Sequence, residues 1–73
     1  MKKYSVIYTP DSGYTETFGP FDTKAKANDW MADDFNHNYK VAKDADVDVQ
    51  WTWNENHSCS IEGLGSWEIV ETY

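Results

Sequence analysis

Four acidic residues in the second half of the chain have the spacing of a calcium-binding loop. Asp44, Asp46, Asp48 and Glu55 stand where the first, third, fifth and twelfth residues of an EF-hand loop place oxygen ligands. The sixth position, however, is Val49, where the sharp turn of that loop needs Gly. The segment also alternates apolar and polar residues, which predicts an extended strand that cannot wrap around one ion. We therefore expect neither a metal site nor any other cofactor, and we keep calcium binding as an alternative.

Histidine and cysteine side chains offer little further chemistry. His57 and Cys59 form a His-x-Cys pair and His37 stands earlier in the chain, but a tetrahedral zinc site usually needs four ligands at other spacings. Cys59 beside His57 lacks a recognisable third catalytic member or oxyanion hole. Asp33 or Asp34 precedes His37 by one helical turn, which is typical of a surface pair. We predict that the protein is not an enzyme and has no catalytic residues.

The charge of the chain is concentrated in one half. Residues 1–43 contain six Lys and six acidic residues, whereas residues 44–73 contain seven acidic residues and no basic one, which accounts for the net charge of −7. Arg is absent. Phosphate recognition requires clustered positive charge and favours the Arg fork, so direct nucleic-acid binding is not expected. A basic protein is the natural partner.

The first half of the chain predicts a hairpin followed by a helix. Residues 3–9 are rich in β-branched and aromatic side chains, and a Pro-Asp-Ser-Gly turn leads to a second strand over residues 14–18. Gly19 and Pro20 are expected to end that strand. Asp22 or Thr23 can cap a helix that runs to about Tyr39 or Ala42, with an apolar stripe at three- and four-residue spacings.

The second half predicts three more strands. Unbroken alternation over residues 44–54 places Val and Trp on one face and Asp, Gln, Thr and Asn on the other. Residues 58–62 should return as a strand with Cys59 and Ile61 inward, and residues 67–71 should close the sheet. The order ββαβββ predicts an α+β fold in which residues 1–73 form a single domain, with a mostly antiparallel sheet and one helix on one face. The other sheet face would be open to solvent.

An acidic row on the polar side of residues 44–54 is the main candidate for binding. Residues two apart on a strand are separated by about 6.6 Å, so Asp44, Asp46 and Asp48 would form a regular line of negative charge. Such a line either faces water or meets a cationic partner. The predicted partner-binding residues are the seven acidic residues of this half: Asp44, Asp46, Asp48, Glu55, Glu62, Glu68 and Glu71. Exposed aromatic side chains, with Tyr14, Tyr73 and one Trp as candidates, would add an anchor that salt does not weaken.

Localisation follows from what the sequence lacks. No stretch approaches the roughly 18 apolar residues of a membrane span, and residues 1–10 have no apolar signal-peptide region. The single cysteine, Cys59, cannot form an internal disulfide, which is consistent with a reducing compartment. We predict a cytoplasmic protein that does not bind membranes.

These seven acidic residues, the small size and the absence of Arg resemble the small acidic proteins with which bacteriophages and prophages block host defence, including DNA mimics and anti-CRISPR proteins. The resemblance implies a non-enzymatic inhibitor, acting in the host cytoplasm, that occupies the basic surface of a nucleic-acid-binding protein or nuclease. The alternative is a structural or assembly module that self-associates, for example as a homodimer, through its free sheet face or an edge strand.

Overall fold

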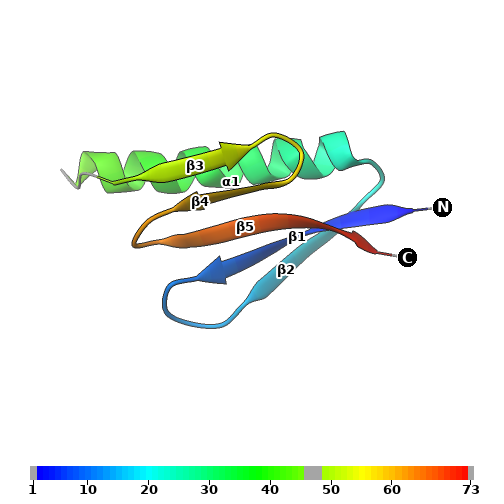
Figure 1. Ribbon diagram of the computed structural model, residues 1–73, viewed down its shortest axis with the longest axis horizontal. Helices are drawn as coiled ribbons and strands as arrows, with labels where there is room; N and C mark the ends of the chain where they lie inside the picture. Colours follow the sequence, from blue (N-terminus) through cyan, green and yellow to red (C-terminus); the bar gives the residue numbers. More distant parts are fainter. Residues whose placement is uncertain (1, 46–48, 73) are drawn as a thin grey trace.

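The computed structural model describes residues 2–45 and 49–72 and shows an α+β fold with the predicted order ββαβββ (Figure 1). One antiparallel sheet has the strand order β2-β1-β5-β4-β3. The elements are β1 Lys3–Pro10, β2 Glu16–Phe21, α1 Lys24–Asp44, β3 Trp51–Asn54, β4 Ser58–Ile61 and β5 Gly65–Thr72. The expected fold class is therefore confirmed.

The helix α1 begins at a conventional cap and packs through one face. The side chain of Thr23 accepts a hydrogen bond from the Lys26 backbone N–H at 3.1 Å, which satisfies one of the free donors of the first turn. Ala27, Met31 and Phe35 recur every four residues and are buried against the sheet. Beside this stripe, the ring of Trp30 stacks on Phe18 of β2 with centroids 4.4 Å apart.

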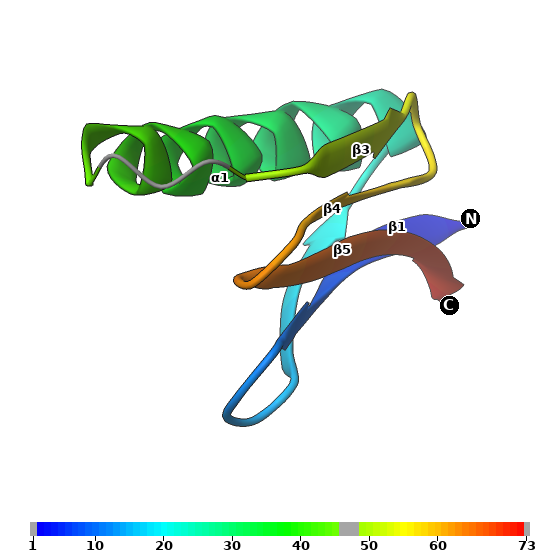
Figure 2. The ribbon, with the colours of Figure 1, turned by 60° about the vertical axis from the view of Figure 1, so that its left-hand side comes forward.

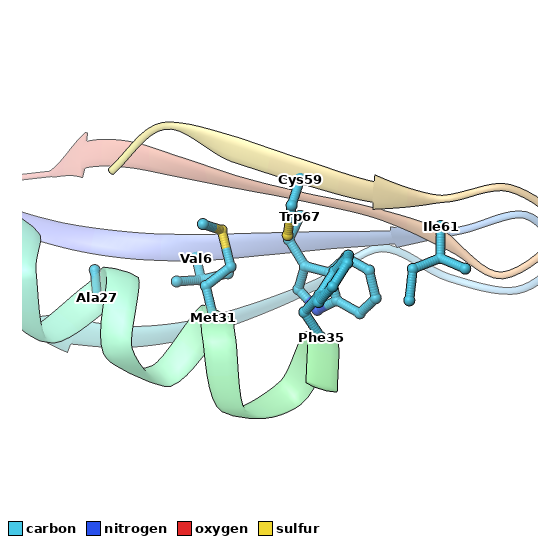
Figure 3. Close-up of a cluster of buried hydrophobic side chains, with 7 residues drawn as sticks. All are labelled: Val6, Ala27, Met31, Phe35, Cys59, Ile61 and Trp67. Carbon is cyan, nitrogen blue, oxygen red and sulfur yellow. The ribbon is translucent and has the colours of Figure 1, made fainter. Parts of the chain in front are cut away.

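The core lies between α1 and one face of the sheet (Figure 3). Val6 of β1, Cys59 and Ile61 of β4 and Trp67 of β5 point from the strands toward the helix. Complete burial of such apolar side chains contributes about 1.5–3 kcal/mol each, which makes this layer the main source of stability. The inward orientation predicted for Cys59 and Ile61 is confirmed.

The second strand lies further along the chain than predicted. It was expected over residues 14–18, but β2 spans Glu16–Phe21 and passes through Gly19 and Pro20. Because β2 is at the edge of the sheet, Pro20, which has no backbone N–H to donate, is tolerated in it. The register between β1 and β2 shifts between Tyr4 and Val6, so the two strands pair on either side of Gly19 and Pro20.

The prediction of one long strand over residues 44–54 is wrong. The helix α1 continues to Asp44 and is capped by Ala45, whose backbone N–H bonds to the Val41 carbonyl at 3.2 Å, while β3 begins only at Trp51. The apolar stripe of the helix extends from Phe35 to Ala42, which is buried. Burial of this part of α1 stabilises helical structure up to Asp44, although the alternation of apolar and polar residues predicts a strand from that residue. The strands β4 and β5 lie where they were expected, within one or two residues of their predicted ends.

Candidate binding surface

The sheet has one face that α1 does not cover. Alternate strand residues point to opposite faces, so the neighbours of the buried Cys59, Ile61 and Trp67 project away from the helix. Figure 2 shows α1 along one side of the sheet, with the loop between β1 and β2 projecting away from it. We call the uncovered surface the open face and define it by Ile7, Thr9, Asp11, Gln50, Thr52, Asn54, Ser58, Ser60, Glu62, Ser66 and Glu68.

Strand register aligns hydroxyl side chains across the open face. Thr9 of β1 pairs with Ser66, Ser66 with Ser60, and Ser60 with Thr52 of β3. Neighbouring strands lie about 4.8 Å apart, so these four residues form a continuous row of small polar side chains. A second row contains Ile7, Glu68, Ser58 and Asn54. The centre of the face is therefore rich in hydrogen-bond acceptors.

Two shallow hollows of about 310 and 350 Å³ lie on this face and share Thr52, Ser60 and Ser66. Glu68 lines the first hollow, and Asp11 and Glu62 line the second. No basic residue of the described chain lines either one. Hydroxyl, amide and carboxylate oxygens of this kind accept hydrogen bonds from ammonium and guanidinium groups.

The structure distributes the predicted partner-binding residues over several places. Glu62 and Glu68 lie on the open face and are exposed. Asp44 is exposed at the last position of α1, so it does not belong to a row on β3. Asp46 and Asp48 lie outside the described residues. The predicted line of carboxylates on one strand is therefore not formed as expected.

Glu55 has internal hydrogen-bonding partners. Its carboxylate accepts hydrogen bonds from the Asn28 amide at 2.7 Å and from the Trp53 indole N–H at 3.1 Å. The Asn28 carbonyl oxygen in turn accepts from the Asn56 backbone N–H at 2.9 Å. These contacts hold the β3–β4 turn against the first part of α1, so Glu55 has a structural role.

The position of Glu55 excludes the EF-hand arrangement. Asn28, its partner, lies sixteen residues before Asp44 on the same helix, and a helix rises 1.5 Å per residue, which separates them by about 24 Å. Asp44 and Glu55 therefore cannot bind the same ion. Among the described residues, no group of three potential metal-ligating side chains is close enough to hold a metal.

Glu71 lies near the end of β5 and forms an ion pair with Lys2 at 3.1 Å. The hydrogen bond from this ammonium to Glu71, together with the attraction between the charges, raises the pKa of Lys2. Glu71 is paired with Tyr4 in the sheet register and so lies on the opposite face from Glu68. It is therefore separate from the open face.

Sequence reasoning missed two acidic residues. Asp11 joins the open face because its backbone N–H bonds to the Leu64 carbonyl at 3.0 Å, which brings the β1–β2 loop next to the β4–β5 turn.

Asp34 accepts a hydrogen bond from the indole of the buried Trp67 at 2.8 Å. The expected surface pair of Asp33 or Asp34 with His37 is absent from the ion pairs of the described residues. Turn composition indicated an exposed Asp11, but no local pattern indicates either contact.

Cys59 is in an environment that suppresses thiol chemistry. Its side chain is only 3% exposed. Burial, and secondarily the negative charge of Asp34, raises the pKa of the Cys59 thiol to about 12. A thiol in this state is neutral near pH 7 and is a poor nucleophile.

Two of the predicted aromatic anchors can be placed. Tyr14, between β1 and β2, is 92% exposed, and Trp51 at the start of β3 is 53% exposed. Tyr73 lies outside the described residues. The exposed aromatic surface is thus divided between the hairpin loop and the β3 edge.

Comparison of the chain with protein-family models, curated proteins and solved structures found no match. Within residues 2–45 and 49–72, no helix is both long and apolar enough to cross a membrane.

Proposed function

We propose that this chain is a non-enzymatic binding protein that uses the open face to engage the basic surface of a nucleic-acid-binding protein. The observation that carries the proposal is the composition of the two hollows, which combine three carboxylates with a row of hydroxyl groups and contain no basic residue of the described chain. None of these carboxylates, on Asp11, Glu62 and Glu68, forms an ion pair within the described part of the chain.

The mechanism would be competitive exclusion. Lys and Arg side chains that otherwise contact phosphates would donate hydrogen bonds to Glu62, Glu68 and the neighbouring hydroxyls, as in phage inhibitors of the DNA-mimic or anti-CRISPR type. Exposed charge pairs are screened over about 8 Å at physiological ionic strength, so the affinity should fall with added salt. Glu55 and Glu71 have internal partners and would contribute mainly to the overall negative potential.

The test is affinity capture from a bacterial lysate with a variant that neutralises the open face. Asp11→Asn, Glu62→Gln and Glu68→Gln together should lose a basic nucleic-acid-binding protein that the wild type retains at low salt and releases at high salt. The captured protein should lose nucleic-acid binding when the wild type is added.

The matched control removes the same number of negative charges elsewhere. Glu16→Gln, Asp33→Asn and Asp44→Asn change exposed residues of β2 and α1. This control should retain the captured protein. If both triple variants lose the captured protein, net charge alone determines binding. If both retain it, the open face is not the site.

A second candidate function is self-association, which the exposed edge of the sheet favours. The strand β3 is at one end of the strand order and carries the exposed Trp51. Light scattering at low and high salt discriminates the two functions, since a dimer that persists in both would favour an assembly module.

A further inference from the structure

The outer edge of β3 offers unpaired backbone groups. β3 is the last strand of the sheet, and no described strand lies beyond it. The Gln50 carbonyl accepts a hydrogen bond from the Glu62 N–H at 2.8 Å, which directs the backbone groups of residues 50, 52 and 54 toward β4 because ladder pairs alternate. The N–H and C=O groups of Trp51 and Trp53 therefore point away from the sheet.

A groove lies beside this edge, between β3 and α1. It has a volume of about 260 Å³ and is lined by Ala32, Phe35, Asn36, Trp51 and Trp53. The two indoles meet the Phe35 ring edge-on, with centroid distances of 5.9 and 5.4 Å. The hydrogen bond from Trp53 to Glu55 fixes one wall of the groove. The groove is thus apolar and largely formed before any ligand arrives.

An unpaired strand edge next to an apolar side-chain pocket is the arrangement that binds extended peptides by strand addition. Main-chain hydrogen bonds supply affinity, and alternate side chains enter the adjoining pocket. We propose that β3 accepts an extended, basic segment of a partner protein as a sixth strand, with one apolar side chain of that segment in the groove.

The negative charge of the protein favours a basic segment, and not a second copy of the chain, as the ligand of the β3 edge. The net charge is −7, so two copies would repel each other when they approach. Glu55 lies just beyond the end of β3, and Asp29 lies one turn before Ala32 on the same flank of α1. Cationic side chains of an added strand would meet these carboxylates, whereas Lys43 lies over the Tyr39 ring at the other end of this flank.

This inference goes beyond the proposed function because it concerns the edge of β3 and not the open face. The two proposals share only the preference for basic partners. An experiment that refutes binding at the edge of β3 therefore leaves the proposed role of the open face intact, and the reverse also holds.

The probe is a ten-residue acetylated and amidated peptide of alternating lysine and valine, and the readout is amide hydrogen exchange followed by NMR. Saturating peptide should slow exchange of the Trp51 and Trp53 amides at least about tenfold, because both become hydrogen-bonded. The triple variant of the open face, Asp11→Asn, Glu62→Gln and Glu68→Gln, should still show this protection. Unchanged exchange at these two amides in the wild type would overturn the inference.

A pair of substitutions separates backbone pairing from side-chain contact. Trp51→Ala keeps the outward N–H and should weaken peptide binding about tenfold through loss of the ring. Trp51→Pro also removes the donor, which an edge strand tolerates, and should weaken binding at least about tenfold further. Equal affinities for the two variants, with folding confirmed by circular dichroism, would contradict strand addition.

Two controls test the chemistry of the occupant. A peptide with glutamate in place of lysine should not protect the Trp51 and Trp53 amides, and equal protection would refute the preference for a basic segment. Protection that rises with protein concentration in the absence of peptide would identify a second copy as the occupant and would overturn the proposal.

Discussion

At the scale of single residues, Asp33 and Asp34 are neighbours on α1 with different roles. Asp33 is exposed, whereas the Asp34 carboxylate accepts the indole N–H of Trp67, a residue with no solvent-exposed surface. A buried donor that loses its partner costs more free energy than the hydrogen bond contributes in water.

Asp34→Ala should therefore lower the free energy of unfolding by about 1–3 kcal/mol, since the Trp67 N–H would be left without its acceptor. Urea unfolding measures this change. Asp33→Ala is the control and should alter stability by less than about 0.5 kcal/mol. Equal effects of the two substitutions would show that the indole contact does not stabilise the fold.

The Cys59 thiol should be unreactive in the folded protein. Alkylation at pH 8 should be at least about a hundredfold slower in native protein than in urea, because reaction requires opening of the core. The pKa of Cys59 is raised from 9.0 to about 12, so between these values only the unfolded thiol ionises and stability falls as the pH rises.

The stability advantage of the wild type over Cys59→Ala should accordingly shrink between pH 8 and pH 10. Rapid native alkylation, or an advantage that grows with pH, would contradict the burial of this thiol.

At the scale of elements, the sequence predicted the helix cap, the inward side chains of β4 and the order of all six elements. It failed at the start of residues 44–54, where the alternation of apolar and polar residues predicts a strand although Asp44 ends the helix and Ala45 caps it. The alternation could not reveal this, because the length of the helix depends on burial of Ala42 against the rest of the molecule. The open face was predicted, but Asp11 entered it only through the tertiary contact with Leu64.

Gly65 of β5 lies so close to the backbone of β1 that a side chain has no room at this position. A Cβ at this residue would lie 2.7 Å from the Thr9 carbonyl oxygen and 2.8 Å from the Pro10 Cα, both in the backbone of β1. Gly65→Ala should therefore destabilise the protein by about 1–3 kcal/mol through overpacking. Ser66→Ala, on the exposed side of the same strand, should change stability little in the same urea unfolding experiment. A neutral Gly65→Ala would mean that β1 and β5 can separate locally without cost.

At the scale of the whole molecule, the net charge of −7 on 73 residues should make stability depend on salt. Sodium chloride should raise the Tm, because it screens repulsion among like charges. The triple variant Asp11→Asn, Glu62→Gln and Glu68→Gln should have a higher Tm at low salt and should gain less from added salt. A gain of about 1 kcal/mol corresponds to roughly 4–8 °C for a domain of this size. A lower Tm in this variant would show that these carboxylates stabilise the fold.

The central position of β5 determines when the molecule can fold during its synthesis. The β1–β2 and β3–β4 hairpins each join neighbouring stretches of chain, but β5 alone lies between them, and it pairs Thr72 with Lys3. Contacts between such distant residues form late, because closing a long loop is entropically costly. On the ribosome the two hairpins should therefore remain unconnected until β5 has left the exit tunnel, and the core should be completed only after that strand has emerged.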